Sequence, residues 1–97
     1  PRGTAIYATG AGEVVFSARQ RGYGNLIKIR HAFGYETVYA HLNRRRVKVG
    51  DKVERGDRIG DMGNTGRSTG THLHYEIRVN GNTVNPAKYI EAARNVL

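Results

Sequence analysis

Short runs of alternating apolar and polar residues, separated by glycines, dominate this sequence. Residues 25–31 (NLIKIRH) and 72–79 (HLHYEIRV) alternate most clearly, and residues 12–18, 35–42 and 58–62 are rich in β-forming side chains. A period of two puts successive side chains on opposite faces of a β-strand. Glycines fill most of the gaps, where turns need backbone freedom. We therefore expect several short antiparallel strands and no parallel strand–helix–strand unit.

The end of the chain carries two further local signals. Asn80-Gly81 lies between two β-prone runs, and both residue types tolerate a positive φ, so a tight hairpin is expected there. Asn85-Pro86 is typical of a helix start, and residues 87–97 carry one apolar stripe. Two Gly-Asp pairs, at 50–51 and 56–57, look like tight corners between short strands. The predicted fold is mainly β, a compact antiparallel sheet or barrel-sandwich with a short C-terminal helix, in a single domain over residues 1–97.

Composition limits the chemistry of the chain. There are 16 Lys and Arg against 8 Asp and Glu, a formal charge of +8, and no Cys. Without Cys there is no disulfide, thiolate metal ligand or cysteine nucleophile. The charge favours an anionic partner, such as nucleic acid, an acidic cell-wall polymer or anionic lipid. We expect the densest basic cluster, Arg44, Arg45, Arg46 and Lys48, to be a solvated loop.

The sequence has no membrane-helix or export pattern. No apolar run approaches the roughly 20 residues of a membrane-spanning helix. The N-terminus has no signal-peptide pattern and no starting Met, which predicts a processed piece of a longer protein.

The candidate chemistry lies in the histidines. In the run 72–79, His72 and His74 share one face with Glu76, while the apolar side chains share the other. Two imidazoles two strand positions apart can converge on one ion or water, either as two ligands or as one ligand and one acid–base group. The alternative is a pair of surface histidines on a solvated face.

Other residues extend this candidate site. The polar, glycine-rich stretch 63–71 (GNTGRSTGT) precedes the two histidines and resembles the rim of a substrate groove, although an ordinary hairpin loop also fits. His41 ends another predicted strand and is a plausible third imidazole if the two strands are neighbours. His31 shares a face with Ile27 and Ile29, which predicts a partly buried histidine with satisfied hydrogen bonds.

Several motifs together resemble the lysostaphin/LytM-type zinc metallopeptidases. They are Tyr39-Ala40-His41-Leu42, the loop GNTGRSTG at 63–70, the run HLHYEIR at 72–78, Asn80-Gly81, Val84-Asn85-Pro86, the opening segments 1–8 and 12–15, and the Gly-Asp corners. The resemblance covers about residues 1–90. It implies a compact antiparallel β-fold with a narrow groove and the hydrolysis of peptide bonds in peptidoglycan cross-links or stems. It also implies a location in the cell envelope, periplasmic or secreted.

The resemblance also implies roles for individual residues. His74 would be a Zn²⁺ ligand, with His41 and His72 as catalytic groups beside the metal and Ser68, Thr69 and Thr71 as substrate-binding residues of the loop. Thr71 stands where the family usually has Pro, which should change the stiffness of the loop.

Part of the family's metal site has no counterpart in this sequence. The family's other two ligands come from a His-x-x-x-Asp motif upstream of the segment matching residues 1–4, so we expect them before Pro1. Asp51, Asp57 and Asp61 do not match that motif. The chain alone is thus expected to hold an incomplete metal site, with an N-terminal fragment of the same protein as a possible partner.

Three other functions compete with this reading. A non-catalytic envelope-binding or amidase-activating domain of the same fold is one, although it has no chemical need for all three histidines. A lipoyl-type carrier would need a modifiable Lys at a hairpin tip, and Asn80-Gly81 offers none. Nucleic-acid binding has only the charge in its favour, since no RNA-binding motif is present.

Overall fold

The computed structural model describes residues 3–63, 74–80 and 82–84. These residues form strands β1 (Ala5–Tyr7), β2 (Gly12–Gln20), β3 (Gly24–Arg30), β4 (Tyr35–Arg45), β5 (Lys52–Val53), β6 (Arg58–Met62), β7 (His74–Val79) and β8 (Asn82–Val84). One 3₁₀ turn, at Ala32–Gly34, joins β3 to β4. The mainly β prediction is confirmed, whereas the helix predicted at 87–97 lies outside the described residues. Nothing helical in the described part is long and apolar enough to cross a bilayer.

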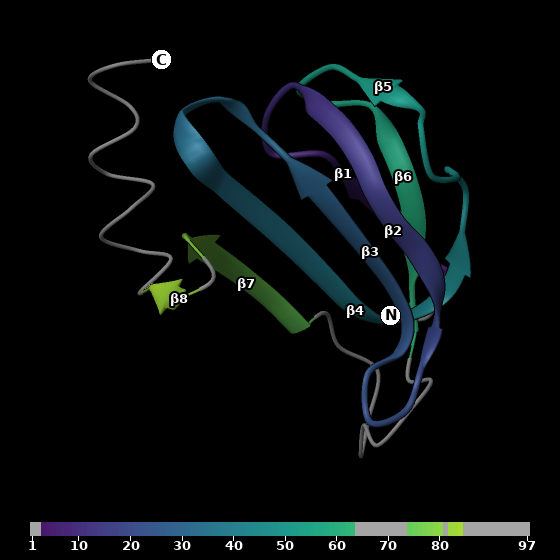
Figure 1. Ribbon diagram of the computed structural model, residues 1–97. Helices are drawn as coiled ribbons and strands as arrows, with labels where there is room; N and C mark the ends of the chain where they lie inside the picture. The colour runs from purple at the N-terminus through teal and green to yellow at the C-terminus, as the bar shows by residue number, and fades with distance from the viewer. Residues whose placement is uncertain (1–2, 64–73, 81, 85–97) are drawn as a thin grey trace.

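Every strand pair is antiparallel, and the sheet curls strongly (Figure 1). Its order is β1-β6-β4-β3-β2-β5, and β7 pairs with β4 and β8. The long strand β4 has β3 along one edge. Along the other edge it pairs first with β7 and then with β6. Two of the three short outer strands, β1 and β5, were not predicted as separate strands from the sequence.

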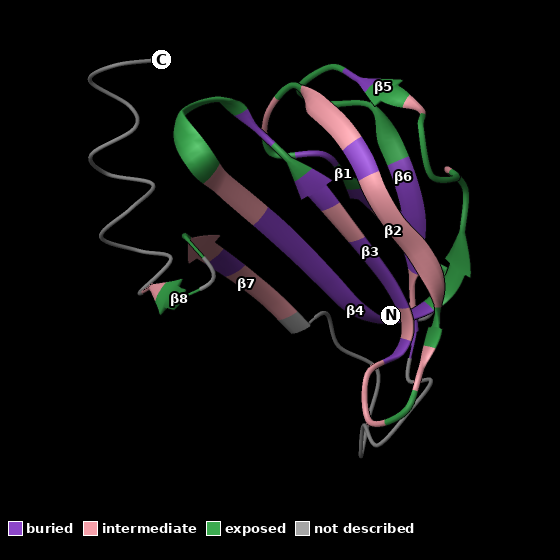
Figure 2. Cartoon of the chain, in the orientation of Figure 1, coloured by how far each residue is buried: buried purple, intermediate pink, exposed green. Residues whose placement is uncertain are grey.

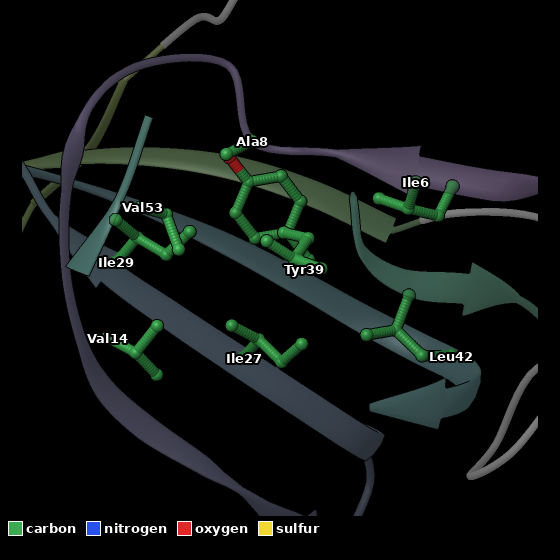
Figure 3. Close-up of a cluster of buried hydrophobic side chains, with 9 residues drawn as sticks. Ile6, Ala8, Val14, Ile27, Ile29, Tyr39, Leu42 and Val53 are labelled. Atoms are coloured by element: carbon green, nitrogen blue, oxygen red, sulfur yellow. The ribbon is translucent and has the colours of Figure 1, made fainter. Parts of the chain in front are cut away.

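The core fills the inside of the curled sheet. Figure 2 shows buried positions running along β3, β4 and β6. Tyr39 is the largest fully buried side chain. The main cluster comprises Ile6, Ala8, Val14, Ile27, Ile29, Tyr39, Leu42, Val53 and Ile59 (Figure 3). A smaller cluster of Leu26, Val38 and Ala40, with Phe16 and Tyr23 against it, occupies the opposite face of β3 and β4, because side chains alternate along each strand. Each fully buried aliphatic side chain contributes about 1.5–3 kcal/mol.

The two Gly-Asp corners are near-identical turns on either side of β5. In each, the Asp amide donates to the carbonyl three residues earlier at 3.0 Å. The Asp carboxylate in turn accepts from the N–H of that earlier residue at 2.9 Å, from Lys48 in one turn and Glu54 in the other. Gly50 and Gly56 have φ of +96° and +90°, as the third position of a type II turn requires. The expectation of tight corners is confirmed.

The predicted hairpin is also present. Val79 and Asn82 are cross-strand partners, so the connection contains two residues, and Asn80 has a φ of +52°. Its N–H donates to the carbonyl of Gly34 at 3.3 Å. This contact joins the β7–β8 turn to the β3–β4 turn at one end of the sheet.

The basic cluster is exposed, as predicted, and Arg46 and Lys48 lie in a loop. Arg44 and Arg45, in contrast, belong to the end of β4, which corrects the loop prediction for these two residues. Arg46 holds the buried carboxylate of Asp61 through two hydrogen bonds of 2.8 and 2.9 Å, and Arg58 adds a contact of 2.7 Å. Hydrogen bonds from Arg46, and then from Arg58, lower the pKa of Asp61 to about 2 despite its burial. The Arg46–Asp61 pair joins residues 15 positions apart, so no local sequence pattern predicts it.

His31 is a buried histidine with both ring nitrogens satisfied, as predicted. Nδ1 lies 2.7 Å from the carbonyl oxygen of Ala11, so Nδ1 carries the proton and donates. Nε2 then accepts from the hydroxyl of Thr37 at 2.6 Å. The ring stacks on Tyr35 with 4.8 Å between centroids. Burial lowers the pKa of His31, so this imidazole stays neutral in the fold.

Replacing Asp61 by Asn is expected to lower the free energy of unfolding at neutral pH by about 1–3 kcal/mol, because the amide cannot satisfy two guanidinium groups. Below about pH 4 the unfolded chain protonates this carboxylate, whereas the folded protein keeps it ionised to about pH 2. The difference in unfolding free energy between wild type and Asp61→Asn should therefore shrink as the pH falls from about 4 to about 2. Urea unfolding at several pH values measures this difference, with the exposed substitution Glu54→Gln as the control. If Asp61→Asn were as stable as wild type at neutral pH, the stabilising role of Asp61 would be refuted.

His31→Phe is expected to keep the ring stacking but to leave the Ala11 carbonyl and the Thr37 hydroxyl without partners. We expect a loss of about 1–3 kcal/mol near pH 7.5. Because the folded pKa is lowered, wild type loses its advantage as pH falls below about 6.5, where the unfolded chain takes up a proton. The gap between the two proteins should narrow from pH 7.5 to pH 5 in denaturant titrations. A gap that widens on acidification would contradict the assigned neutral state.

Candidate functional site

The candidate site lies where β4 changes neighbour. Residues 35–40 of β4 pair with β7, and from Leu42 onward β4 pairs with β6. His41 is the residue between the two pairings. The side chain predicted from sequence to be catalytic therefore occupies the junction of three strands.

A β-bulge sets the direction of His41. Across β3, Ile27 faces Tyr39 and Asn25 faces Leu42, so two residues of β4, Ala40 and His41, oppose one residue of β3. His41 has a φ of +58°, and its N–H donates to the carbonyl of Tyr23 at 2.8 Å. A non-glycine residue in this left-handed region is uncommon.

The bulge has a direct consequence for burial. In a regular strand His41 would face the main core together with Tyr39, and Leu42 would face the other way. Instead Tyr39 and Leu42 both belong to the main cluster (Figure 3). The extra residue thus releases His41 from the alternation, although it remains buried at 8% exposure. Bulges of this kind commonly redirect a side chain beside an active site.

Asn25 and Arg45 hold the bulge in place. The Asn25 amide donates to the carbonyls of Leu42 at 3.0 Å and Asn43 at 3.3 Å, just after the irregular position. Arg45 donates to the Asn25 side-chain oxygen at 3.2 Å and to the Ser17 carbonyl at 2.9 Å. Neither residue was predicted from the sequence to support the site. The signal that was available is an Asn at the start of an alternating strand.

His74 begins β7, and its cross-strand partner is Ala40, the residue immediately before His41. The structure therefore brings the His41 and His74 positions together on adjacent strands, as the sequence analysis required. The other predicted site residues, His72, Ser68, Thr69 and Thr71, lie outside the described residues.

Three hydroxyl groups fasten the start of β7 to the body of the sheet. Tyr39 and Tyr75 are cross-strand partners with ring centroids 5.3 Å apart. The Thr9 hydroxyl lies 3.0 Å from each tyrosine oxygen. Burial raises the pKa of Tyr75 to about 12, so its hydroxyl stays protonated at neutral pH. This network fixes the residue next to His74 and supplies no base.

The donor types at this junction fit zinc. Imidazole nitrogen is a preferred Zn²⁺ ligand, and two histidines occupy neighbouring strands here. The described ranges contain no group of three or more His, Cys, Asp or Glu residues that could hold a metal. Asp51 and Asp57 close the two turns and Asp61 is held by arginines, so these three carboxylates have structural partners.

Comparison with known proteins identifies relatives over most of the chain. The sequence pattern of Peptidase family M23 matches residues 1–86. The DD-carboxypeptidase/endopeptidase Mpg of Neisseria meningitidis is 52% identical over 86 residues, covering 89% of this chain and 20% of Mpg. The peptidoglycan DD-endopeptidase ShyC of Vibrio cholerae is 51% identical, with the same two coverages. The lipoprotein YgeR of Escherichia coli is 45% identical, covering 93% and 36%. The chain thus spans about a fifth to a third of these relatives.

Solved structures agree with the sequence relatives. A zinc-containing peptidase from Vibrio cholerae superposes with a TM-score of 0.84 at 42% identity, covering 87% of this chain and 26% of that one. The catalytic domain of the antimicrobial peptidase lysostaphin from Staphylococcus simulans gives 0.87 at 33% identity, covering 94% and 73%. The curled sheet, the histidines at its strand junction and these matches lead to one conclusion: the chain belongs to Peptidase family M23.

Proposed function

We propose that this chain is the catalytic part of a zinc metalloendopeptidase that hydrolyses peptide bonds in peptidoglycan cross-links or stems. The observation that carries the proposal is the bulged His41, buried beside the strand position of His74. The relatives named as peptidoglycan endopeptidases and the zinc-containing structural neighbour support it. Relatives of this kind, with the lipoprotein YgeR, also support action in the cell envelope, periplasmic or secreted.

In this proposal His74 is a zinc ligand, and the remaining His and Asp ligands come from residues preceding Pro1. When bound, Zn²⁺ supplies a Lewis acid and activates a water for attack on the peptide carbonyl. Ser68, Thr69 and Thr71 bind the substrate peptide from the loop that leads into β7. The formal charge of +8 suits an anionic cell-wall polymer.

His41 and His72 act on protons and on developing charge. A histidine within hydrogen-bond reach can take a proton from the attacking water or return one to the leaving amine. A donor aimed at the tetrahedral oxyanion stabilises it more than the planar carbonyl, which lowers the barrier. The bulge keeps His41 in one backbone conformation, and the Asn25–Arg45 contacts keep the bulge, so the imidazole is held before substrate arrives.

His41→Asn is the sharpest test of this role, because Asn tolerates a left-handed φ and so preserves the bulge while removing the imidazole. We expect cleavage of purified muropeptides to fall by about 10²–10⁴-fold. Zinc content and the thermal unfolding midpoint should match wild type. His41→Ala is the companion variant, equally inactive but less stable, since Ala gains strain at φ +58°. Muropeptide cleavage by His41→Asn at the wild-type rate would remove His41 from the mechanism.

Metal analysis of the full-length protein should find about one zinc per chain, and a chelator should abolish cleavage reversibly. His74→Ala is expected to lose both zinc and cleavage, whereas His72→Ala keeps zinc and loses cleavage. Absence of zinc from the full-length protein would exclude the proposed enzyme. Binding to sacculi that survives metal removal, without cleavage at any zinc concentration, would instead favour a non-catalytic envelope-binding domain.

A further inference from the structure

Charged residues form a row across the sheet at the end of β7 remote from His74. The register makes Glu13 the partner of Arg30, Arg30 the partner of Glu36, and Glu36 the partner of Arg78. The signs therefore alternate across β2, β3, β4 and β7. Arg78 is four residues from His74, which corresponds to about 13 Å along an extended strand.

The two outer residues of this row have ion-pair partners, and the two inner ones have none among the described residues. Glu13 has Lys52 at 3.8 Å, and Arg78 has Glu76 at 2.8 Å. Arg30 and Glu36 are directly opposite each other, yet neither forms an ion pair with any residue that the structure describes. Side chains of opposite charge on cross-strand partners ordinarily form a stabilising ion pair.

A cavity of about 200 Å³ lies at this point, lined by Arg30, Gly34, Tyr35, Glu36 and Arg78. Two of its wall residues are held in place. Tyr35 stacks on the buried ring of His31, and the Arg78 side chain, only 22% exposed, is held by Glu76 and Tyr23. Arg30, Glu36 and Arg78 thus place two positive charges and one negative charge around a small space.

Phe33 lies in the turn just before the Gly34 wall of this cavity. Its side chain is 84% exposed, and its backbone is in the left-handed region at φ +63° and ψ +26°. Both features are unfavourable for a large aromatic residue. Local strain of this kind concentrates at ligand-binding sites, where function retains it.

We propose that this cavity binds a zwitterionic amino-acid group that bears an aliphatic chain. The carboxylate lies between the guanidinium groups of Arg30 and Arg78, the ammonium faces Glu36, and the chain packs on Phe33. Charge complementarity selects this ligand. A ligand with only a negative charge would give Glu36 no ion-pair partner, and one with only a positive charge would give Arg30 none. Resting on the proposed function, the group is a free amino-acid end of the peptidoglycan peptide, anchored away from the cleaved bond.

Direct binding tests the cavity without cleavage. In amide NMR titrations of the full-length protein, leucine should saturably shift the signals of Tyr35, Glu36 and Arg78. Leucine methyl ester lacks the carboxylate and N-acetylleucine lacks the ammonium, so each should bind at least tenfold more weakly. Equal binding of the three compounds, or no binding of leucine, would overturn the proposal.

Variants separate the charge from the fold. Arg30→Gln and Glu36→Gln should each weaken leucine binding at least tenfold, while exposed Arg55→Gln removes the same charge elsewhere and should leave it unchanged. Phe33→Asn should weaken binding and raise the unfolding midpoint by a few degrees, since Asn accepts the left-handed φ. Unchanged leucine affinity in Arg30→Gln would refute the assigned contact.

Cleavage assays distinguish this proposal from the proposed function. Arg30→Gln should raise the KM for a muropeptide with a free amino-acid end and leave kcat unchanged. His41→Asn should bind leucine as wild type does while failing to cleave. Leucine binding without cleavage in the wild-type protein would reject the peptidase and keep the cavity. Cleavage with a KM that is indifferent to Arg30 would reject the cavity's role and keep the peptidase.

Discussion

The extra residue in β4 is the constraint on which the site depends. Strand β4 pairs with β3 along one edge, and along its other edge it pairs first with β7 and then with β6. In a regular strand the side chains would alternate between the two faces throughout, and His41 would then face the core. The bulge shifts the alternation by one residue, so the core side chains Tyr39 and Leu42 stay inside on both sides of the junction. The same irregularity therefore keeps the core packing continuous and turns His41 out of the alternation.

The buried polar groups of the sheet have fixed hydrogen-bond partners. Asp61 is ionised and held by two arginines, and His31 is neutral between a carbonyl and a hydroxyl. The described residues contain no buried side-chain nitrogen or oxygen without a hydrogen-bond partner. A small β-domain with no disulfide gains its rigidity in this way, because an unsatisfied buried polar group costs about as much as a good contact contributes.

The longer strands, the Gly-Asp and Asn-Gly turns and the burial of His31 could be predicted from local sequence. Each depends on a period of two, on a two-residue turn signal, or on the side chains that share one face. The short strands β1 and β5 have too few residues to show a period of two. The bulge could not, since it exists only in the register between β3 and β4. The Asn25–Arg45 contacts and the Asp61 ion pairs join residues at least 15 positions apart, apart from the local bond from Arg58. The charged cavity depends on the alignment of three strands, so no window of sequence contains it. For His41, the sequence predicted a third imidazole near the site, and the structure adds its left-handed backbone conformation in the bulge.

The attachment of β7 has a consequence for how the protein is held together. In the described chain, β7 pairs only with β4 and β8. Its Tyr75 packs on the main core and contacts the Thr9 hydroxyl, and its Ile77 is buried. All nine buried members of the main cluster nevertheless come from residues 6–59, so most of the hydrophobic interior does not depend on β7. The position of His74 beside Ala40 and His41, in contrast, depends wholly on the pairing of β7 with β4.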